Sequence, residues 1–300
     1  MKKWCLFFSI YICLCLLAAC AAGTGTSEEP DGEERNVPTE ETTENQIVCR
    51  VISETDSSLL LAEQETGESI YTLSLEGKKL TLDGADFDPE APGAYQALPA
   101  GSLVGAMATV TYDGGIEESW PARLGGVTAV EFSTENFNDL CGLYLQVLED
   151  LWEVDSGLNE GITELGVDLS GTRLSESEQA AVAWAFGQTH GIAPIEGTYE
   201  ELVEQGYITG EPLGGDASAD AKFWQWEDGC LFSIEEGEEP VVFSLPSIGP
   251  GEVIPAYDGV RFDAQKWSSG LGAYFFSDCT AVSNGNGHWA SYSVGEEMIS

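Results

Sequence analysis

The sequence predicts an α+β protein, with a small antiparallel β-barrel over residues 46–132 and a second domain over residues 133–300 in which helices pack on a curved antiparallel sheet. Two observations support this prediction. Short strand-like segments separated by Gly, Pro and Asp fill the first stretch, whereas helical spacing followed by more strand-like segments fills the second. Helices followed by a run of strands are typical of the α+β class. The length suffices for two ordinary domains.

The barrel prediction depends on many short segments lying close together. Five strand-like segments occur before residue 133, and a Gly-, Pro- and Asp-rich excursion at 83–102 interrupts them. Five or six strands in fewer than about ninety residues favour a small closed barrel. The segments are 47–53, 58–64, 69–75, 103–112 and 122–132.

The second stretch begins with helices. Residues 136–154 are predicted to be helical because their apolar side chains recur every three or four positions. A capping box at Ser175 and Glu178 begins another helix, which we expect to stop at Gly191. The apolar positions of the first helix are Phe137, Leu140, Tyr144, Val147, Leu148 and Leu151.

A third helix and a series of strands complete the second stretch. Thr198 and Glu201 form another capping box, and Gly206 is the expected end of that helix. From residue 222 the pattern is strand-like, and residues 227–229 (Glu-Asp-Gly) predict a hairpin turn between the first two strands. The predicted strands are 223–226, 230–234, 240–245, 259–266, 272–282 and 288–294.

The first twenty residues have the organisation of a secretion signal. Lys2 and Lys3 precede an apolar run, 4–17, which is long enough for the core of a signal peptide. The run is shorter than the about 20 apolar residues that span a membrane. Small residues follow and end at Cys20. One explanation is an ordinary cleaved signal peptide with a chance cysteine.

The run Leu17-Ala18-Ala19-Cys20 resembles the lipobox of bacterial lipoproteins. In that family a peptidase cuts before the cysteine, and a diacylglycerol is attached to its sulfur. The resemblance implies a signal peptide over residues 1–19, a lipid on Cys20, and a location on the extracytoplasmic face of the cell membrane. Two acyl chains anchor a protein stably where a single chain does not.

The segment after Cys20 is predicted to be a disordered, acidic tether. Residues 21–45 carry eight acidic side chains and one basic one and show no apolar periodicity. Such a segment buries too little apolar surface to offset its ordering entropy. An acidic linker directly after a lipidated cysteine resembles those of Gram-positive lipoproteins, which implies a protein that faces the cell wall.

Two other stretches resemble lipoproteins of Firmicutes. Residues 110–122 are similar to a run in OB-like domains of uncharacterised Gram-positive secreted proteins. Residues 266–273 and the end of the chain resemble a C-terminal domain of unknown function in such lipoproteins. The predicted layout of that half also resembles the cone-shaped nuclear-transport-factor-like or cystatin-like folds. These resemblances imply folds, and they supply no catalytic residues.

The charge excludes one class of partner. Removal of residues 1–19 leaves 9 basic and 52 acidic residues, a formal charge of −43. Nucleic acids require Lys and Arg to neutralise their phosphates, so we expect no nucleic-acid binding. The acidity is otherwise explained by solubility or by binding of divalent cations.

One acidic cluster has the composition of a calcium site. Asp83, Asp86, Asp88 and Glu90 lie within eight residues of a predicted loop. Calcium prefers several oxygen ligands on a flexible loop. The spacing departs from the EF-hand pattern at the position of its glycine and at the position of its bidentate glutamate. A solvated loop without a bound ion is therefore the competing explanation. Apart from calcium, we expect no cofactor.

Four cysteines remain beyond Cys20 and can pair in three ways. The extracytoplasmic compartment permits disulfides, but four cysteines in so long a chain are sparse. If one disulfide forms, Cys230 with Cys279 is favoured because both lie in predicted strands. Otherwise the cysteines behave as small buried apolar residues. The four are Cys49, Cys141, Cys230 and Cys279.

Nothing after Cys20 matches a local catalytic or metal motif, since HExxH, GxSxG, Walker and CxxC patterns do not occur. The two histidines, His190 and His288, have no metal-ligand partner nearby in sequence. Cys279 and His288 could in principle form a nucleophile pair, but their spacing in the sequence does not indicate one. A glycosidase-like carboxylate pair remains an alternative, but 52 acidic residues give no means to select one.

Tryptophans in the second stretch have two interpretations. Trp224 and Trp226 lie two residues apart on one face of a predicted strand. They either fill the core between helices and sheet or line a concave aromatic pocket, together with Lys266 and Tyr274. The sequence therefore favours a lipid-anchored, non-enzymatic protein that binds a ligand or partner at the cell envelope. A secreted carboxylate-dependent hydrolase of cell-wall or glycan substrates and a purely structural interaction protein are the alternatives.

Overall fold

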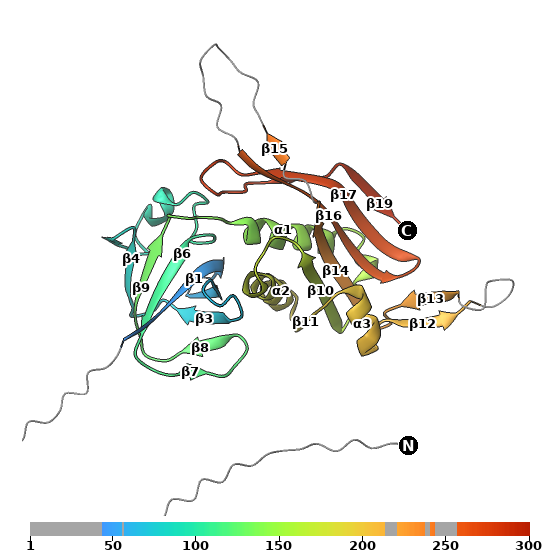
Figure 1. Cartoon of the computed structure of the whole chain (residues 1–300), viewed down its shortest axis with the longest axis horizontal. Coiled ribbons are helices and arrows are strands. Elements are labelled where there is room, and N and C mark those ends of the chain that lie inside the picture. The colour runs from blue at the N-terminus through green and yellow to red at the C-terminus, as the bar shows by residue number, and fades with distance from the viewer. Residues whose placement is uncertain (1–43, 56, 214–220, 238–240, 244–256) are drawn as a thin grey trace, which may run out of the picture. The chain divides into compact units, whose positions relative to one another are not determined.

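The computed structural model shows a mixed α+β protein with three α-helices and two large sheets among its described residues (Figure 1). The compact unit runs from Thr42 to Ser300. The predicted signal peptide, Cys20 and almost all of the tether lie outside the described part. The structure describes residues 44–55, 57–213, 221–237, 241–243 and 257–300.

The first sheet, sheet A, contains the strands predicted before residue 133. Most neighbours are antiparallel, but β3 pairs in parallel with β8, and β4 pairs in parallel with β9. No closed barrel is found among the described strands, so the ladder is an open, mixed sheet. Its order is β5 (Ala85–Asp86), β4 (Lys79–Leu82), β9 (Val127–Ser133), β6 (Met107–Tyr112), β1 (Asn45–Glu54), β2 (Ser58–Glu63), β3 (Ile70–Ser74), β8 (Ala122–Leu124) and β7 (Ile116–Glu117).

The second sheet, sheet B, is also mixed rather than antiparallel. Strand β10 runs parallel to both β11 and β14. Helix α2 forms the connection between β10 and β11, as a parallel pair of successive strands requires. The strands are β10 (Glu164–Gly171), β11 (Pro194–Glu196), β12 (Thr209–Pro212), β13 (Lys222–Gln225), β14 (Gly229–Glu236), β15 (Val241–Phe243), β16 (Tyr257–Ser269), β17 (Gly272–Val282), β18 (Tyr292–Ser293) and β19 (Glu296–Ile299). Their order is β11-β10-β14-β16-β13-β12, with β15 and β17 also on β16 and with β18 and β19 on β17.

The three helices begin and end close to their predicted positions. Both predicted capping boxes are formed, at Ser175 and at Thr198. In each, the N-cap side chain accepts the backbone N–H of the glutamate three residues later, and the carboxylate of that glutamate accepts the backbone N–H of the N-cap residue. Gly191 and Gly206 end their helices in the left-handed conformation, which glycine adopts without strain. The bounds are α1 (Leu140–Glu153), α2 (Glu176–His190) and α3 (Tyr199–Gln205), with short 3-10 turns at Ala94–Ala97 and Ser156–Leu158.

Helices cover both faces of sheet B, which corrects the prediction of a single covered face. On β14 the side chains of Cys230 and Phe232 join the core beneath α1 and α2, whereas Leu231 points to the other side. There it packs with Leu202 of α3 and with Trp226. We call these the α1 face and the α3 face. The alternation follows from the two-residue period of a strand.

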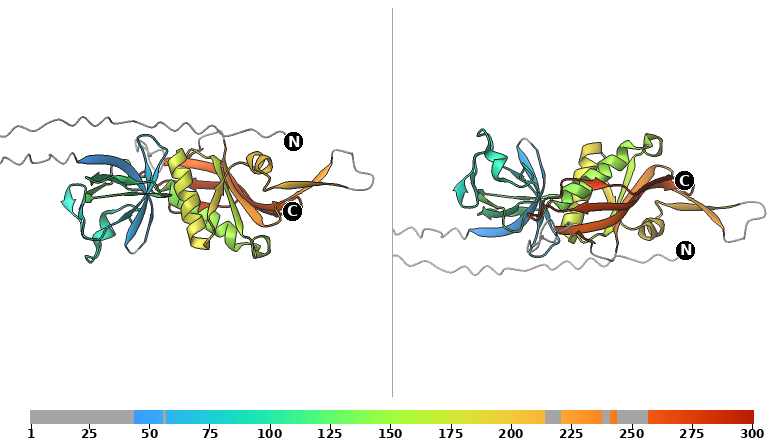
Figure 2. Two further views of the ribbon diagram at one scale, coloured as in Figure 1. Left: turned by 90° about the horizontal axis from the view of Figure 1, so that it is seen from below. Right: turned by 90° about the horizontal axis from the view of Figure 1, so that it is seen from above.

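The predicted hairpin at residues 227–229 is wrong. Strand β13 pairs with β12 and with β16, and β14 pairs with β10 and β16, so β13 and β14 are not neighbours. The β12–β13 ribbon instead extends away from the rest of sheet B (Figure 2). Gly229 serves a different purpose from the expected turn, because the Trp226 indole occupies the position that a Cβ at residue 229 would need.

Helix α2 packs on both sheets. Ile52, Leu60 and Ile70 of sheet A belong to the same buried cluster as α1, α2 and the α1 face of sheet B. The Ser177 hydroxyl of α2 donates to the carbonyl of Glu63, at 2.7 Å. The two predicted domains therefore share one core across residue 133. Within the part of the chain that the structure describes, no helix combines the length and apolar character needed to cross a membrane.

Candidate functional site

A hollow with a volume of about 870 Å³ lies on sheet A. We call it the sheet A groove. Its walls are the β1–β2 turn, the β3–β4 turn and the excursion from Phe87 to Ser102. The size falls within the range of roughly 300–1,000 Å³ that is typical of ligand sites.

Two aromatic rings form part of the groove lining, and a ring contact and a hydrogen bond hold them in place. Phe87 and Tyr95 meet edge to face with ring centroids 5.7 Å apart. The Tyr95 hydroxyl donates to Glu54 Oε1 at 2.7 Å, and Leu103 N donates to Glu54 Oε2 at 3.0 Å. Glu54 thus ties the middle of the excursion and the residue directly after it to the end of β1, which fixes this wall of the groove.

The rim of the groove is acidic. Glu76, Asp88 and Glu90 line it and are exposed, and Lys78 is the one basic side chain among the lining residues. Asp88 Oδ1 accepts the backbone N–H of Glu90 at 3.0 Å, which fixes the turn that carries both carboxylates. The burial of Tyr95 and its bond to Glu54 raise the pKa of the tyrosine, so its hydroxyl stays a donor near neutral pH.

The four residues of the predicted calcium loop do not converge. Asp83 turns toward β9, where it accepts from Thr134 N at 2.9 Å and from Thr134 Oγ1 at 2.8 Å. Partial desolvation alone would raise the pKa of Asp83, but these bonds hold it below its ordinary value. Asp86 is exposed on β5, and only Asp88 and Glu90 reach the groove. Within the described residues, no group of three or more acidic, His or Cys side chains is arranged to hold a metal ion.

The four residues of the predicted aromatic pocket are divided between the two faces of sheet B. Trp224 and Trp226 do share one cluster, on the α3 face. The Trp226 indole is buried and donates to Glu164 Oε2 at 2.6 Å, so it is part of the core. Trp224 is partly buried, with the Lys222 ammonium 5.2 Å from its ring.

Lys266 and Tyr274 lie on the α1 face, as a cross-strand pair of β16 and β17. Lys266 is fully buried, and its ammonium donates to the carbonyls of Val154 and Asp155 and to Asn159 Oδ1. Burial lowers the pKa of Lys266. Its side chain caps the chain directly after α1 and does not face a pocket with the tryptophans.

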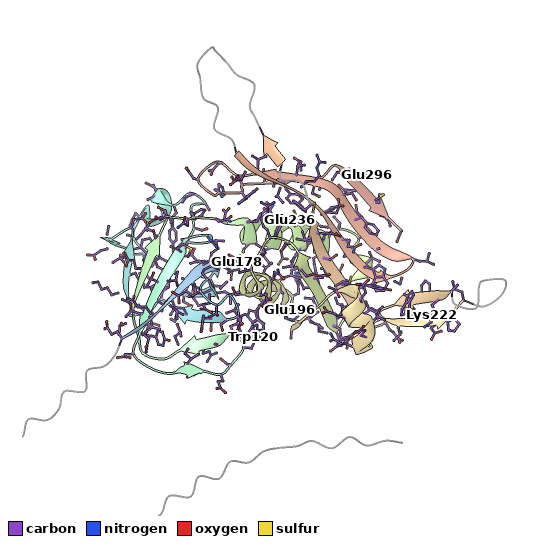
Figure 3. All side chains as sticks on the ribbon, in the orientation of Figure 1. Trp120, Glu178, Glu196, Lys222, Glu236 and Glu296 are labelled. Atoms are coloured by element: carbon purple, nitrogen blue, oxygen red, sulfur yellow. The ribbon has the colours of Figure 1, made fainter. Side chains whose placement is uncertain are left out.

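A second cavity, of about 240 Å³, lies at the carboxyl ends of the parallel strands β10 and β11. Asp168, Glu196 and Glu201 line it, with Gln179 of α2. Glu196 is an exposed residue, and partial desolvation by the atoms around its carboxyl raises the pKa of that group above its ordinary value. Figure 3 shows Glu196 near α2 and α3, and Glu178 on the opposite side of α2. We call this the Glu196 cavity.

The histidines and cysteines hold structural positions. His288 Nδ1 lies 2.5 Å from Asp139 Oδ2, and His190 Nε2 lies 2.9 Å from Glu149 Oε2 while its ring stacks on Trp152. Cys279 is buried, and desolvation raises its pKa to about 12, so its sulfur is a thiol at neutral pH. This disfavours a Cys279–His288 nucleophile pair.

All four cysteines Cys49, Cys141, Cys230 and Cys279 are free and buried. The favoured disulfide between Cys230 and Cys279 is not formed. Strand β16 lies between β14, which carries Cys230, and β17, which carries Cys279. Two strand spacings amount to roughly 10 Å, beyond the about 7 Å that a disulfide can bridge.

Sequence reasoning missed the groove because its lining comes from separate turns. The composition of residues 83–102 singled out a long excursion, but nothing in it indicated that Phe87 and Tyr95 pack beside the β3–β4 turn. Glu196 carried no local signal either, because the cavity that it lines is formed with residues of β10, α2 and α3. Comparison with protein-family models, with curated proteins and with solved structures gives no significant match.

Proposed function

We propose that this chain is a lipid-anchored, extracytoplasmic protein that binds a ligand at the cell envelope without transforming it. The leader supports the anchor, because a positive start, an apolar core and a lipobox-like end occur in the expected order. The sheet A groove supports binding, since it is large enough for a ligand and has two aromatic rings in its lining. The groove is the observation that carries the binding function.

The OB-like character of sheet A belongs to the same proposal. Strands β8 and β9 are separated only by Gly125 and Gly126. If β8 and β9 are counted as one interrupted strand, that strand pairs with β3 on one side and with β6 on the other. Because β6 pairs with β1, and β1, β2 and β3 pair in series, the five strands would then form a ring, as in a five-stranded, partly open Greek-key barrel. The pairing of β3 with β8 in parallel supports this interpretation.

The anchor is tested in cells with the whole chain. Wild-type protein should incorporate a labelled fatty acid and sediment with membranes, whereas Cys20→Ser should be unlabelled and released. A Cys13→Ser variant is the matched control, because Cys13 lies inside the predicted signal peptide and should leave lipidation unchanged. Unlabelled wild-type protein in the medium would refute the anchor.

Binding at the groove is tested on residues 42–300, the compact unit. Hydrogen exchange should slow in residues 75–102 when a ligand from a panel of envelope glycans and peptides occupies the groove, while exchange in α1 stays unchanged. If the ligands of the panel slow hydrogen exchange only outside residues 75–102, or do not slow it in any part of the protein, the groove is refuted as the binding site.

A carboxylate-dependent hydrolase of cell-wall or glycan substrates is the second candidate, and the Glu196 cavity is the observation that favours it. A carboxyl with a raised pKa beside two other carboxylates is a typical environment for an acid catalyst. If the chain hydrolyses a glycan, Glu196→Gln should abolish the activity and Glu200→Gln, on the exposed side of α3, should retain it. Activity that survives Glu196→Gln would exclude this site.

A further inference from the structure

The charge of the sheet A groove indicates which ligands it accepts. Among its lining residues Glu54, Glu76, Asp88 and Glu90 are acidic and Lys78 is basic. Glu54 already accepts two hydrogen bonds, so the three exposed carboxylates are the ones available to a ligand. A concave surface lined by one sign of charge raises the local concentration of the opposite charge.

The aromatic lining adds a second requirement on the same ligand. Phe87 and Tyr95 are half-buried in the wall, with Leu75 and Pro89 beside them. Aromatic faces attract ammonium and guanidinium groups, and apolar walls accommodate the methylene stems that carry those groups. Lysine and arginine side chains combine both features, whereas free metal ions and neutral sugars each match only one.

We propose that the sheet A groove binds a lysine- or arginine-bearing peptide segment, with the basic side chains directed at Glu76, Asp88 and Glu90 and their stems against Phe87 and Tyr95. This inference rests on the proposed ligand-binding function and specifies its ligand class. The chain's own tether is a poor occupant, because residues 21–45 carry eight acidic side chains and one basic one. The groove therefore serves a partner of opposite charge.

The test separates recognition by the groove from general attraction to an acidic protein. Residues 42–300 are titrated with a short capped peptide of alternating Gly and Lys, at low and at high salt. The paired variant Glu76→Gln with Glu90→Gln removes two rim charges, and Glu117→Gln with Glu131→Gln removes two exposed charges elsewhere on sheet A. Lys78→Gln removes the basic side chain from the groove.

The groove variant should weaken binding about fivefold or more relative to the control pair, since each exposed charge pair contributes roughly two- to fivefold. Lys78→Gln should strengthen binding about two- to fivefold, and high salt should weaken binding to the wild type. Equal losses in the groove and control variants would overturn the proposal in favour of bulk attraction.

Three more probes distinguish the remaining explanations. Capped free lysine that binds as tightly as the peptide would overturn a peptide segment as the ligand. If a neutral disaccharide or a Gly–Gln peptide slows hydrogen exchange at residues 75–102 and the lysine peptide does not, the basic ligand class is refuted. The groove would then still be a binding site. If none of the probes slows exchange there, the groove and the basic ligand class are both refuted.

Discussion

Arg50 of β1 and Glu178 of α2 form a partly buried ion pair, with Arg50 Nε 2.8 Å from Glu178 Oε1. Arg50 Nη1 also donates to the carbonyls of Gly105 and Asn136, each at 3.1 Å. The same glutamate completes the capping box of α2 by accepting the Ser175 N–H. One carboxylate thus orders the start of α2 and fixes that helix to sheet A.

Removing one partner of this pair should destabilise the whole protein. Arg50→Leu leaves the partly buried Glu178 without its cationic partner, and we expect a loss of about 1–3 kcal/mol in the free energy of unfolding. Arg123→Leu, on an exposed position of β8, is the matched control and should change stability by less than about 1 kcal/mol. Because the two sheets share a core, urea denaturation should follow one transition, and two separate transitions would contradict the shared core.

Lys266 should stabilise the turn that follows α1. Lys266→Met keeps a similar volume but leaves the carbonyls of Val154 and Asp155 and the Asn159 side chain without their common donor. We expect a loss of about 1–3 kcal/mol in the free energy of unfolding. Lys222→Met, at an exposed position above Trp224, is the control. Equal effects of the two substitutions would exclude a capping role for Lys266.

Gly229 should be intolerant of any side chain. A Cβ at residue 229 would overlap the Trp226 indole, which is itself held by Glu164. Gly229→Ala should therefore destabilise the protein by about 1–3 kcal/mol through overpacking. Gly115→Ala has open space and an ordinary φ, so thermal denaturation should show little change there. A tolerated Gly229→Ala would mean that Trp226 moves freely.

The four free cysteines should react slowly in the native state. Burial raises the pKa of both Cys230 and Cys279 to about 12, so neither offers a thiolate at neutral pH. In residues 42–300 a thiol reagent should modify almost nothing before unfolding and four thiols per chain after it, without a reducing agent. Fewer than four in the unfolded chain would reveal a disulfide.

Stability should fall at alkaline pH, and Tyr144 should contribute to that fall. Its burial and its 2.7 Å bond to Glu236 raise the pKa of Tyr144, so the folded state keeps the proton after the unfolded chain, with a value near 10, has lost it. The contribution is fully present below about pH 10 and is lost as the pH rises toward the folded-state value. Urea denaturation between pH 8 and 11 should show a shallower decline for Tyr144→Phe than for wild type, and parallel declines would contradict this assignment.

Local signals in the sequence predicted much of the secondary structure. The boxes at Ser175 and Thr198, with Gly191 and Gly206, located α2 and α3 nearly to the residue, because caps are satisfied by groups within one turn of the chain. Strand-like segments separated by turn residues likewise predicted β1, β2, β6 and β17. Lipidation of Cys20 is also a purely local signal, and it stays a prediction.

Tertiary structure alone decided which strands pair and which side chains meet. Residues 227–229 read as a hairpin, yet β14 pairs with β10 and β16, since register depends on the face that each strand buries. Lys266 and Trp226 lie on opposite faces of sheet B, so the residues of the predicted pocket are divided between those faces. The sheet A groove and the Glu196 cavity draw on separate turns and helices. The sequence by itself determined many of the elements, because caps and turns depend on neighbouring residues, and it leaves the membrane anchor as a prediction. The strand pairings and the cavities depend on contacts between residues far apart in the chain, so only the tertiary structure decided them.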